Sequence, residues 1–250
     1  MTYTTVIFDL DGTAIPHRPD GVPSHKVVEA MLAAHSSLKL CAATGRAYRN
    51  SSYILHAFQL VDPCVVSGGT QIVDPTNGKI LWQVNMLQAD VAAALDICRP
   101  FPYEVIWRSE ILGEGAPAAA RVAEDGVNVM YVMACSEPDA DSMLRELNRL
   151  PRIVAVPVRS WTDDGVDIHI TNSSATKEHA VEVLLDMLKV KKTEVIGVGD
   201  GGNDMHLFRS VGRKVAMGNA VEELKQAADE VCASVEQDGL ADVLQRYATK

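Results

Sequence analysis

Three short polar segments stand where buried strands should end, and they carry most of the side chains that could do chemistry. They are Asp9-Leu10-Asp11-Gly12-Thr13, Thr44-Gly45-Arg46 and Gly199-Asp200-Gly201-Gly202-Asn203-Asp204. If the strands before them run parallel, all three segments meet at one edge of a sheet. The four carboxylates that would gather there repel one another unless a cation lies among them.

Oxygen ligands without histidine or cysteine favour magnesium, which keeps some of its waters and accepts a phosphate oxygen of a substrate. The sequence therefore predicts a Mg²⁺ site, and its candidate metal residues are Asp9, Asp11, Asp200 and Asp204. We expect Asp204 to orient the groups that bind the ion rather than to bind the ion itself.

The neighbouring groups suit a phosphorylated substrate. Thr13, Thr44 and the backbone N–H groups near Gly12 and Gly45 could hold phosphate oxygens. Lys177 stands at the start of a predicted helix, where it could neutralise charge on both the phosphate and a nucleophile.

These residue types together allow a two-step transfer of a phosphoryl group. The carboxylate of Asp9 can attack phosphorus and form an aspartyl-phosphate. Asp11, two residues on in an extended segment, can point back over the site, protonate the leaving oxygen and then activate water. The metal ion and Lys177 would stabilise the equatorial oxygens in both steps. Asp9, Asp11 and Lys177 are therefore the predicted catalytic residues.

The elements that must position these segments alternate between strands and helices in two outer sections of the chain. Apolar runs predict buried strands at residues 3–8, 38–43 and 194–198. Apolar residues at helical spacing predict helices at residues 24–35, with Ser24 as the cap, and at residues 47–58, 177–188 and 203–209. Strand, loop and helix in this order predict a doubly wound, Rossmann-like α/β core with a parallel sheet and right-handed crossovers.

The middle of the chain has a strand-rich α+β pattern that differs from its surroundings. We predict that residues 85–171 form an inserted α+β cap domain, and that residues 1–84 and 172–250 form the catalytic core. Four side chains of the insert could reach a substrate, although an interface or surface role is favoured for each: Trp107, Arg108, Arg121 and His169.

Composition and charge exclude several classes of function. The chain has 250 residues, of which 47% are hydrophobic and 22% charged, so it can bury a sizeable core. A formal net charge of −10 disfavours nucleic acid and anionic membrane surfaces as partners. The chain shows neither a signal peptide nor a membrane-spanning run, and its five scattered cysteines suit a reducing compartment. We expect a cytoplasmic monomer or small homo-oligomer.

The same motifs resemble those of the haloacid dehalogenase superfamily. Asp9 to Thr13 is similar to the first motif, Thr44 to the second, Lys177 to the third and Gly199 to Asp204 to the fourth. The Thr-Gly-Arg form resembles the Cof-type, sugar-phosphatase-like branch, and so do Met217-Gly218-Asn219-Ala220 and Glu236-Gln237-Asp238-Gly239-Leu240. The position of the insert fits that branch too. Ser67-Gly68-Gly69 replaces the Asn-Gly that many of its members carry after the third strand.

The resemblance implies a role for each matching residue. Asp9 would be the nucleophile and Asp11 the acid and base, and Mg²⁺ would be bound by Asp9, the backbone carbonyl of Asp11 and Asp200. Thr44 and Lys177 would bind the phosphoryl group.

The remaining matching residues complete the predicted site. Asn203 and Asp204 would support the metal and the lysine. The predicted substrate-binding residues are Thr13, Thr44, Gly45, Arg46 and Asn203. Arg46 is as well suited to pairing with a core carboxylate as to touching a substrate.

These inferences lead to one hypothesis and two alternatives. The hypothesis is a magnesium-dependent phosphomonoester hydrolase that acts on a small phosphorylated metabolite, either a sugar phosphate or a phosphorylated small acid. The nearest alternative is a phosphomutase of the same superfamily, which returns the phosphoryl group to another hydroxyl. The alternative from another class is a phosphate sensor that binds without catalysis, although a sensor has no need of Asp11.

Overall fold

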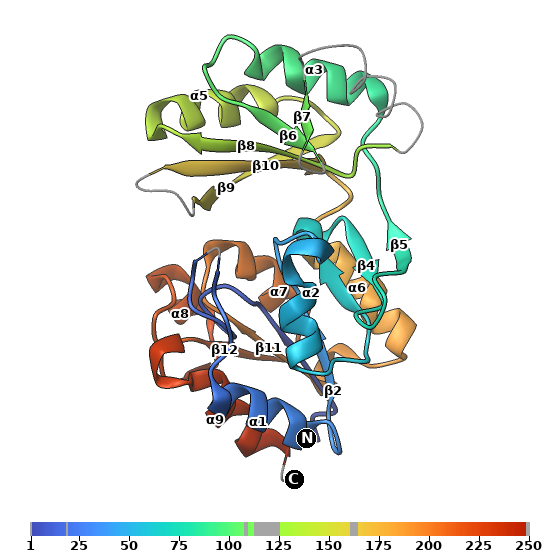
Figure 1. Ribbon diagram of the computed structural model, residues 1–250, viewed down its shortest axis with the longest axis vertical. Coiled ribbons are helices and arrows are strands. Elements are labelled where there is room, and N and C mark those ends of the chain that lie inside the picture. The colour runs from blue at the N-terminus through green and yellow to red at the C-terminus, as the bar shows by residue number, and fades with distance from the viewer. Residues whose placement is uncertain (1, 19, 108–109, 113–125, 161–164, 249–250) are drawn as a thin grey trace. The chain divides into compact units, whose positions relative to one another are not determined.

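The computed structural model describes residues 2–18, 20–107, 110–112, 126–160 and 165–248. The chain divides into two compact units, shown in Figure 1. The core unit comprises Met1–Trp82 and Lys177–Lys250, and the inserted unit comprises Gln83–Thr176. The insert that the sequence analysis expects spans residues 85–171. Both ends of the chain therefore contribute to the core unit.

A parallel sheet forms the centre of the core unit. Its strands are β1 (Thr5–Phe8), β2 (Lys39–Ala42), β11 (Val195–Gly199), β12 (Arg213–Ala216) and β13 (Glu230–Val231). Among the described residues their order is β13-β12-β11-β1-β2, and every neighbouring pair is parallel. Because β1 lies between β11 and β2, the segments that follow these three strands meet at one edge of the sheet.

Burial explains why β1 and β11 are continuous apolar runs. Every residue of both strands is buried, as expected for central strands covered on two faces. Phe8 belongs to an apolar cluster that includes Met31, whereas its neighbour Ile7 belongs to another that includes Leu184. The alternating side chains of β1 thus pack against helices on opposite faces, and the predicted doubly wound α/β fold is confirmed.

The helices of the core unit include the four that the sequence analysis places, each close to its predicted position. They are α1 (His25–Ala34), α2 (Tyr48–Ala57), α6 (Lys177–Leu188), α7 (Met205–Arg209), α8 (Glu222–Ala227) and α9 (Gly239–Ala248). The predicted cap of α1 is confirmed, because the hydroxyl of Ser24 accepts the backbone N–H of Val27 at 3.1 Å. A small sheet of β3 (Cys64–Val66), β4 (Gln71–Val73) and β5 (Ile80–Gln83) completes the unit.

Within its described residues, the inserted unit combines an antiparallel sheet with helices, an α+β pattern as the sequence predicts. Its strands are β6 (Val105–Trp107), β7 (Glu110–Leu112), β8 (Val129–Cys135), β9 (Ile153–Arg159) and β10 (Val166–Asn172), in the order β7-β6-β8-β10-β9. The helices among its described residues are α3 (Gln88–Cys98) and α5 (Glu137–Leu147). Side chains from the sheet and both helices form one apolar cluster, so this unit has a core of its own.

Within the described ranges, we find no helix with the length and apolar character needed to cross a membrane.

Candidate active site

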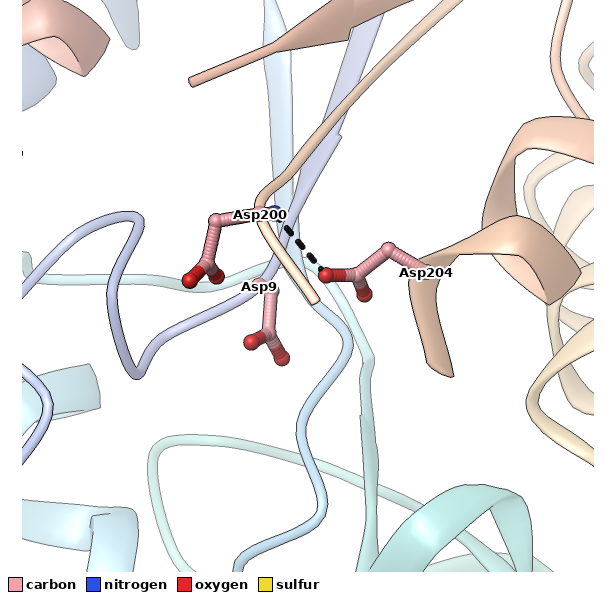
Figure 2. A group of neighbouring side chains, drawn as sticks. All are labelled: Asp9, Asp200 and Asp204. Carbon is pink, nitrogen blue, oxygen red and sulfur yellow. Dashed lines mark hydrogen bonds between the residues drawn. The ribbon is translucent and has the colours of Figure 1, made fainter. Parts of the chain in front are cut away.

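Three carboxylates converge at the carboxyl edge of the parallel sheet. Asp9 directly follows β1 and extends its ladder, since its backbone N–H donates to the carbonyl of Val198 at 3.0 Å. Asp200 directly follows β11, and Asp204 precedes α7. Each of the three aspartates has a carboxylate oxygen within 4.8 Å of such an oxygen in the other two (Figure 2). The structure thus brings together three of the four predicted carboxylates, whereas the carboxylate of Asp11 pairs with Arg46 instead.

Lys177, the first residue of α6, lies between two of these carboxylates. Its ammonium group donates to Oδ1 of Asp9 at 3.1 Å and to Oδ1 of Asp204 at 2.7 Å. The side chain is only 4% exposed. Burial alone would lower the pKa of Lys177, but the charges of Asp204 and Asp9 raise it above its ordinary value. The lysine is therefore protonated and contributes one positive charge to the cluster.

Asp204 already has hydrogen-bond donors on both of its oxygens. Oδ2 accepts the backbone N–H groups of Asp200 and Gly201, both at 3.0 Å, and Figure 2 draws the first of these bonds. Oδ1 accepts a hydrogen bond from the ammonium group of Lys177, and the residue is completely buried. This arrangement suits a residue that orients the lysine and the loop better than one that binds an ion directly.

The first motif packs directly against Asp200. The hydroxyl of Thr13 donates to Oδ1 of Asp200 at 3.0 Å, so this hydroxyl proton is used within the protein. Gly12 has a φ of +74°, and a Cβ at this position would lie 2.1 Å from Oδ2 of Asp200. Both the backbone conformation and the close approach of the carboxylate therefore require glycine.

Arg46 pairs with Asp11, which is one of the two roles that the sequence leaves open. Nε of Arg46 donates to Oδ2 of Asp11 at 2.8 Å, and Nη2 donates to Oδ1 at 2.5 Å. The guanidinium also donates to the backbone carbonyls of Arg18 at 2.9 Å and Asn50 at 3.2 Å. The side chain of Arg46 is only 2% exposed. Its bidentate pair with the carboxylate therefore fixes the position of Asp11, the predicted acid and base.

The loop after β2 brings Thr44 and Gly45 to the same edge of the sheet. Thr44 is buried, and its hydroxyl oxygen accepts the backbone N–H of Arg46 at 3.1 Å. The neighbouring loop after β3 supports it, because the backbone N–H of Gly68 donates to the carbonyl of Thr44 at 3.2 Å. Ser67 adopts a left-handed φ of +53°, a conformation that asparagine and glycine tolerate better than serine.

The other sequence candidates have different surroundings. Asn203 is partly buried, and its Oδ1 lies 2.4 Å from where a Cβ on Gly201 would be. In the inserted unit, Trp107 is buried in the apolar cluster. His169 packs edge-to-face on Tyr131, and burial lowers the pKa of this histidine to about 4. Arg108 and Arg121 lie outside the described residues.

One residue with contacts to this site was missed as a candidate. The side-chain amide of Asn219 donates to the backbone carbonyl of Gly12 at 2.8 Å and to Oδ2 of Asp200 at 3.4 Å. The Met217-Gly218-Asn219-Ala220 stretch was a signal of family resemblance, but nothing in the sequence shows that this loop returns to the first motif.

The electrostatics of the cluster fit a bound cation. Burial raises the pKa of Asp9 well above its usual range, Lys177 opposes this, and the charges of Asp204 and Asp200 add to it. Burial and the charge of Asp204 also raise the pKa of Asp200, to about 7. One lysine is thus too little positive charge for three carboxylates, and oxygen donors without nitrogen or sulfur suit Mg²⁺.

We expect the unfolding free energy of the metal-free protein to fall as the pH rises from about 4 to about 7. Over this range the folded protein keeps a proton on Asp200, whose pKa is about 7, whereas the unfolded chain loses it near 3.8. Binding of Mg²⁺ requires the deprotonated carboxylate, so Mg²⁺ should raise the Tm more at pH 8 than at pH 5.5. Thermal unfolding with Mg²⁺ or a chelator tests this. An equal Mg²⁺ effect at both pH values would contradict it, and Asp200→Asn should weaken the pH dependence.

Comparison of the sequence with known proteins identifies a family and several relatives. A family model described as haloacid dehalogenase-like hydrolase matches residues 6–111 and 121–244. The 5-amino-6-(5-phospho-D-ribitylamino)uracil phosphatase YitU of Bacillus subtilis is 26% identical, with 97% of this chain and 96% of that protein covered.

Other curated relatives align over a shorter stretch. The phosphoglycolate phosphatase of Methanothermobacter thermautotrophicus is 33% identical over 85 residues, which are 34% of this chain and 38% of that protein. Several such alignments span only about a third of the relative, between 30% and 38% of its length.

A solved structure shows the same fold over nearly the whole chain. BT1666 from Bacteroides thetaiotaomicron, a phosphatase of the haloalkanoate enzyme superfamily, superposes with a TM-score of 0.82. The sequence identity is 20%, and the match covers 98% of this chain and 95% of that one. At this identity the likeness concerns the fold, including the inserted unit.

Proposed function

The chain belongs to the haloacid dehalogenase-like hydrolases, and from this premise we propose that it is a magnesium-dependent phosphatase of a small phosphorylated metabolite. The observation that carries the proposal is the buried group at the end of β1. There the carboxylate of Asp9 has Lys177 on one side at 3.1 Å and Asp200 near it. A nucleophile, a charge-neutralising lysine and an oxygen-rich cation site are the parts that phosphoryl transfer needs.

In the first step an oxygen of Asp9 forms a bond to phosphorus while the bond from phosphorus to the leaving oxygen breaks. Asp11 gives its proton to that leaving oxygen, which departs as an alcohol. In the second step Asp11 takes a proton from water, the water oxygen bonds to phosphorus, and the bond to Asp9 breaks. Inorganic phosphate leaves, and both aspartates return to their initial state.

The surrounding residues hold the reacting groups in place. Mg²⁺ would be held by Asp9, Asp200 and the backbone carbonyl of Asp11, and when bound it supplies positive charge to the phosphate oxygens. Lys177 neutralises negative charge beside Asp9, and Asp204 orients Lys177.

The other loop residues divide into two groups. Thr44 and Gly45 offer a hydroxyl and a backbone N–H to the phosphate. Asn203 supports the loop that carries Asp200. Thr13 fixes the carboxylate of Asp200 by a hydrogen bond.

We assign the inserted unit the role of a cap that excludes water and selects the leaving group. The named substrates of the relatives are phosphoglycolate and a phosphoribityl compound, a phosphorylated small acid and a sugar-alcohol phosphate. These two chemical classes are our candidates for the substrate.

Hydrolysis of a chromogenic phosphomonoester, with Mg²⁺ and with a chelator, tests the reaction class. We expect activity that requires Mg²⁺, and then a preference within a panel that includes phosphoglycolate and sugar phosphates. Product analysis by phosphate release separates hydrolysis from transfer to another hydroxyl, which leaves no free phosphate. Activity that persists at full strength in chelator would contradict the proposal.

Replacing Arg46 with lysine should lower kcat by about 100-fold and leave KM nearly unchanged. Lysine keeps the positive charge but cannot reproduce the two parallel bonds to Asp11, so the acid and base loses its fixed position. Steady-state kinetics on the preferred substrate measure both constants, and Asp11→Asn provides the comparison. If Arg46 instead bound the substrate, Arg46→Lys would raise KM, and this result would contradict the role in positioning Asp11.

A further inference from the structure

Two sequence stretches with no assigned role lie against each other in the core unit. One contains Gly218 and Asn219, and the other spans residues 233–239. The backbone N–H of Gly218 donates to the carbonyl of Ala233 at 3.1 Å, and that of Val235 donates to Oδ1 of Asn219 at 2.8 Å. A Cβ on Gly239 would lie 2.0 Å from the carbonyl oxygen of Ala233. The two stretches therefore form one closely packed support.

This support fixes the amide of Asn219 in one orientation. Because Oδ1 accepts from Val235, Nδ2 must point the other way, toward Gly12 and Asp200. Nδ2 donates to the carbonyl of Gly12 at 2.8 Å and to Oδ2 of Asp200 at 3.4 Å. An exposed asparagine would ordinarily move freely, whereas this one is held at both ends of its amide.

Asp200 thus receives a donor on each of its oxygens. Thr13 donates to Oδ1 at 3.0 Å, and Asn219 approaches Oδ2 from the other side. The backbone carbonyl of Asp200 accepts the N–H of Val221 at 3.0 Å, which ties the residue to the same loop as Asn219. Asp9 and Asp204 both repel the charge of Asp200, so a carboxylate without these donors would turn away from them.

We infer that Asn219 is a positioning residue for the cation site, and that the segment 233–239 near the carboxyl end of the chain holds Asn219 in place. This inference rests on the proposed function, since it concerns the Mg²⁺ that Asp200 would bind. Loss of a group that hydrogen-bonds a metal-binding carboxylate typically lowers metal affinity or activity about 10- to 100-fold.

The test is the affinity of the full-length protein for Mg²⁺ alone, measured by calorimetric titration without substrate. Asn219→Ala should raise the Kd for Mg²⁺ about 10-fold. Its phosphatase activity should recover toward the wild-type value when Mg²⁺ is raised to saturation. A merely structural role would lower the Tm in chelator without changing the Kd.

Asn77→Ala is the matched control. Asn77 is also exposed and in the core unit, and it makes the same kinds of bond away from the acidic cluster. Its amide donates to Oδ2 of Asp74 at 2.9 Å, and its Oδ1 accepts the backbone N–H of Lys79 at 2.8 Å. Asn77→Ala should therefore shift the Tm about as much as Asn219→Ala and leave the Kd for Mg²⁺ unchanged.

Val235→Pro tests the contribution of the segment 233–239, because proline removes the N–H that orients Asn219. Alone it should weaken Mg²⁺ binding, and in the Asn219→Ala background it should have no further effect on the Kd. A wild-type Kd in Asn219→Ala would overturn the inference and leave the proposed function intact. A wild-type protein that binds no Mg²⁺ would overturn both, so the two failures are distinguishable.

Discussion

Replacing Asp9 with asparagine should reduce turnover by at least about 10⁴-fold while leaving the protein folded. An amide oxygen is too weak a nucleophile to form the bond to phosphorus, so the first step of the proposed reaction is lost. The variant has nearly the same shape, and its amide oxygen can still accept a hydrogen bond from Lys177, which donates to Oδ1 of Asp9 at 3.1 Å in the wild type.

The stability of the same variant carries a second expectation. The pKa of Asp9 lies well above its usual range because burial and the nearby carboxylates disfavour its charged form. Neutral asparagine removes that repulsion, so at pH 8 in chelator the Tm of Asp9→Asn should be higher than that of the wild type. Turnover and thermal unfolding on the same preparation measure both effects. Near-normal turnover would rule out covalent catalysis by Asp9, and a large fall in Tm would mean that the loss of activity reflects misfolding.

The part of the site that sequence predicts best is the part that the parallel sheet positions. Asp9 and Asp200 each follow a fully buried apolar strand, and adjacent parallel strands place the residues after them side by side. Lys177 could be found for a related reason, because it begins a helix whose apolar spacing is clear from the sequence. Their convergence is a consequence of backbone topology, which apolar periodicity largely specifies.

Contacts that depend on side-chain direction across distant loops could not be predicted. The pairing of Arg46 with Asp11 depends on how the loop after β2 turns toward Asp11 and Arg18. The bond from Thr13 to Asp200 joins residues that are 187 positions apart in the sequence. The edge strand β13 has two residues, one of them Glu230, so it shows no periodic signal. The roles given to the site residues and the domain boundaries remain predictions.

Replacing Lys177 with methionine should have the largest effect on stability and should also remove activity. The lysine is the buried cation between Asp9 and Asp204, and methionine keeps much of its volume but none of its charge. Two buried carboxylates then lose their partner, and breaking such a pair lowers the unfolding free energy by about 3–5 kcal/mol. We expect this loss in chemical denaturation at pH 8 with chelator, and Mg²⁺ should restore part of it by supplying positive charge nearby.

The double variant Lys177→Met with Asp9→Asn separates charge from packing. If the lysine acts by its charge, its removal matters less once Asp9 is already neutral, so the loss caused by Lys177→Met should be smaller in the Asp9→Asn background. The bond from Lys177 to Asp204, at 2.7 Å, accounts for the part of the loss that should persist. An equal loss in both backgrounds would mean that the aliphatic chain of Lys177 stabilises the fold by packing. In that case the electrostatic account of the cluster, in which burial raises the pKa of Asp9 and the charge of Lys177 opposes this rise, would be wrong.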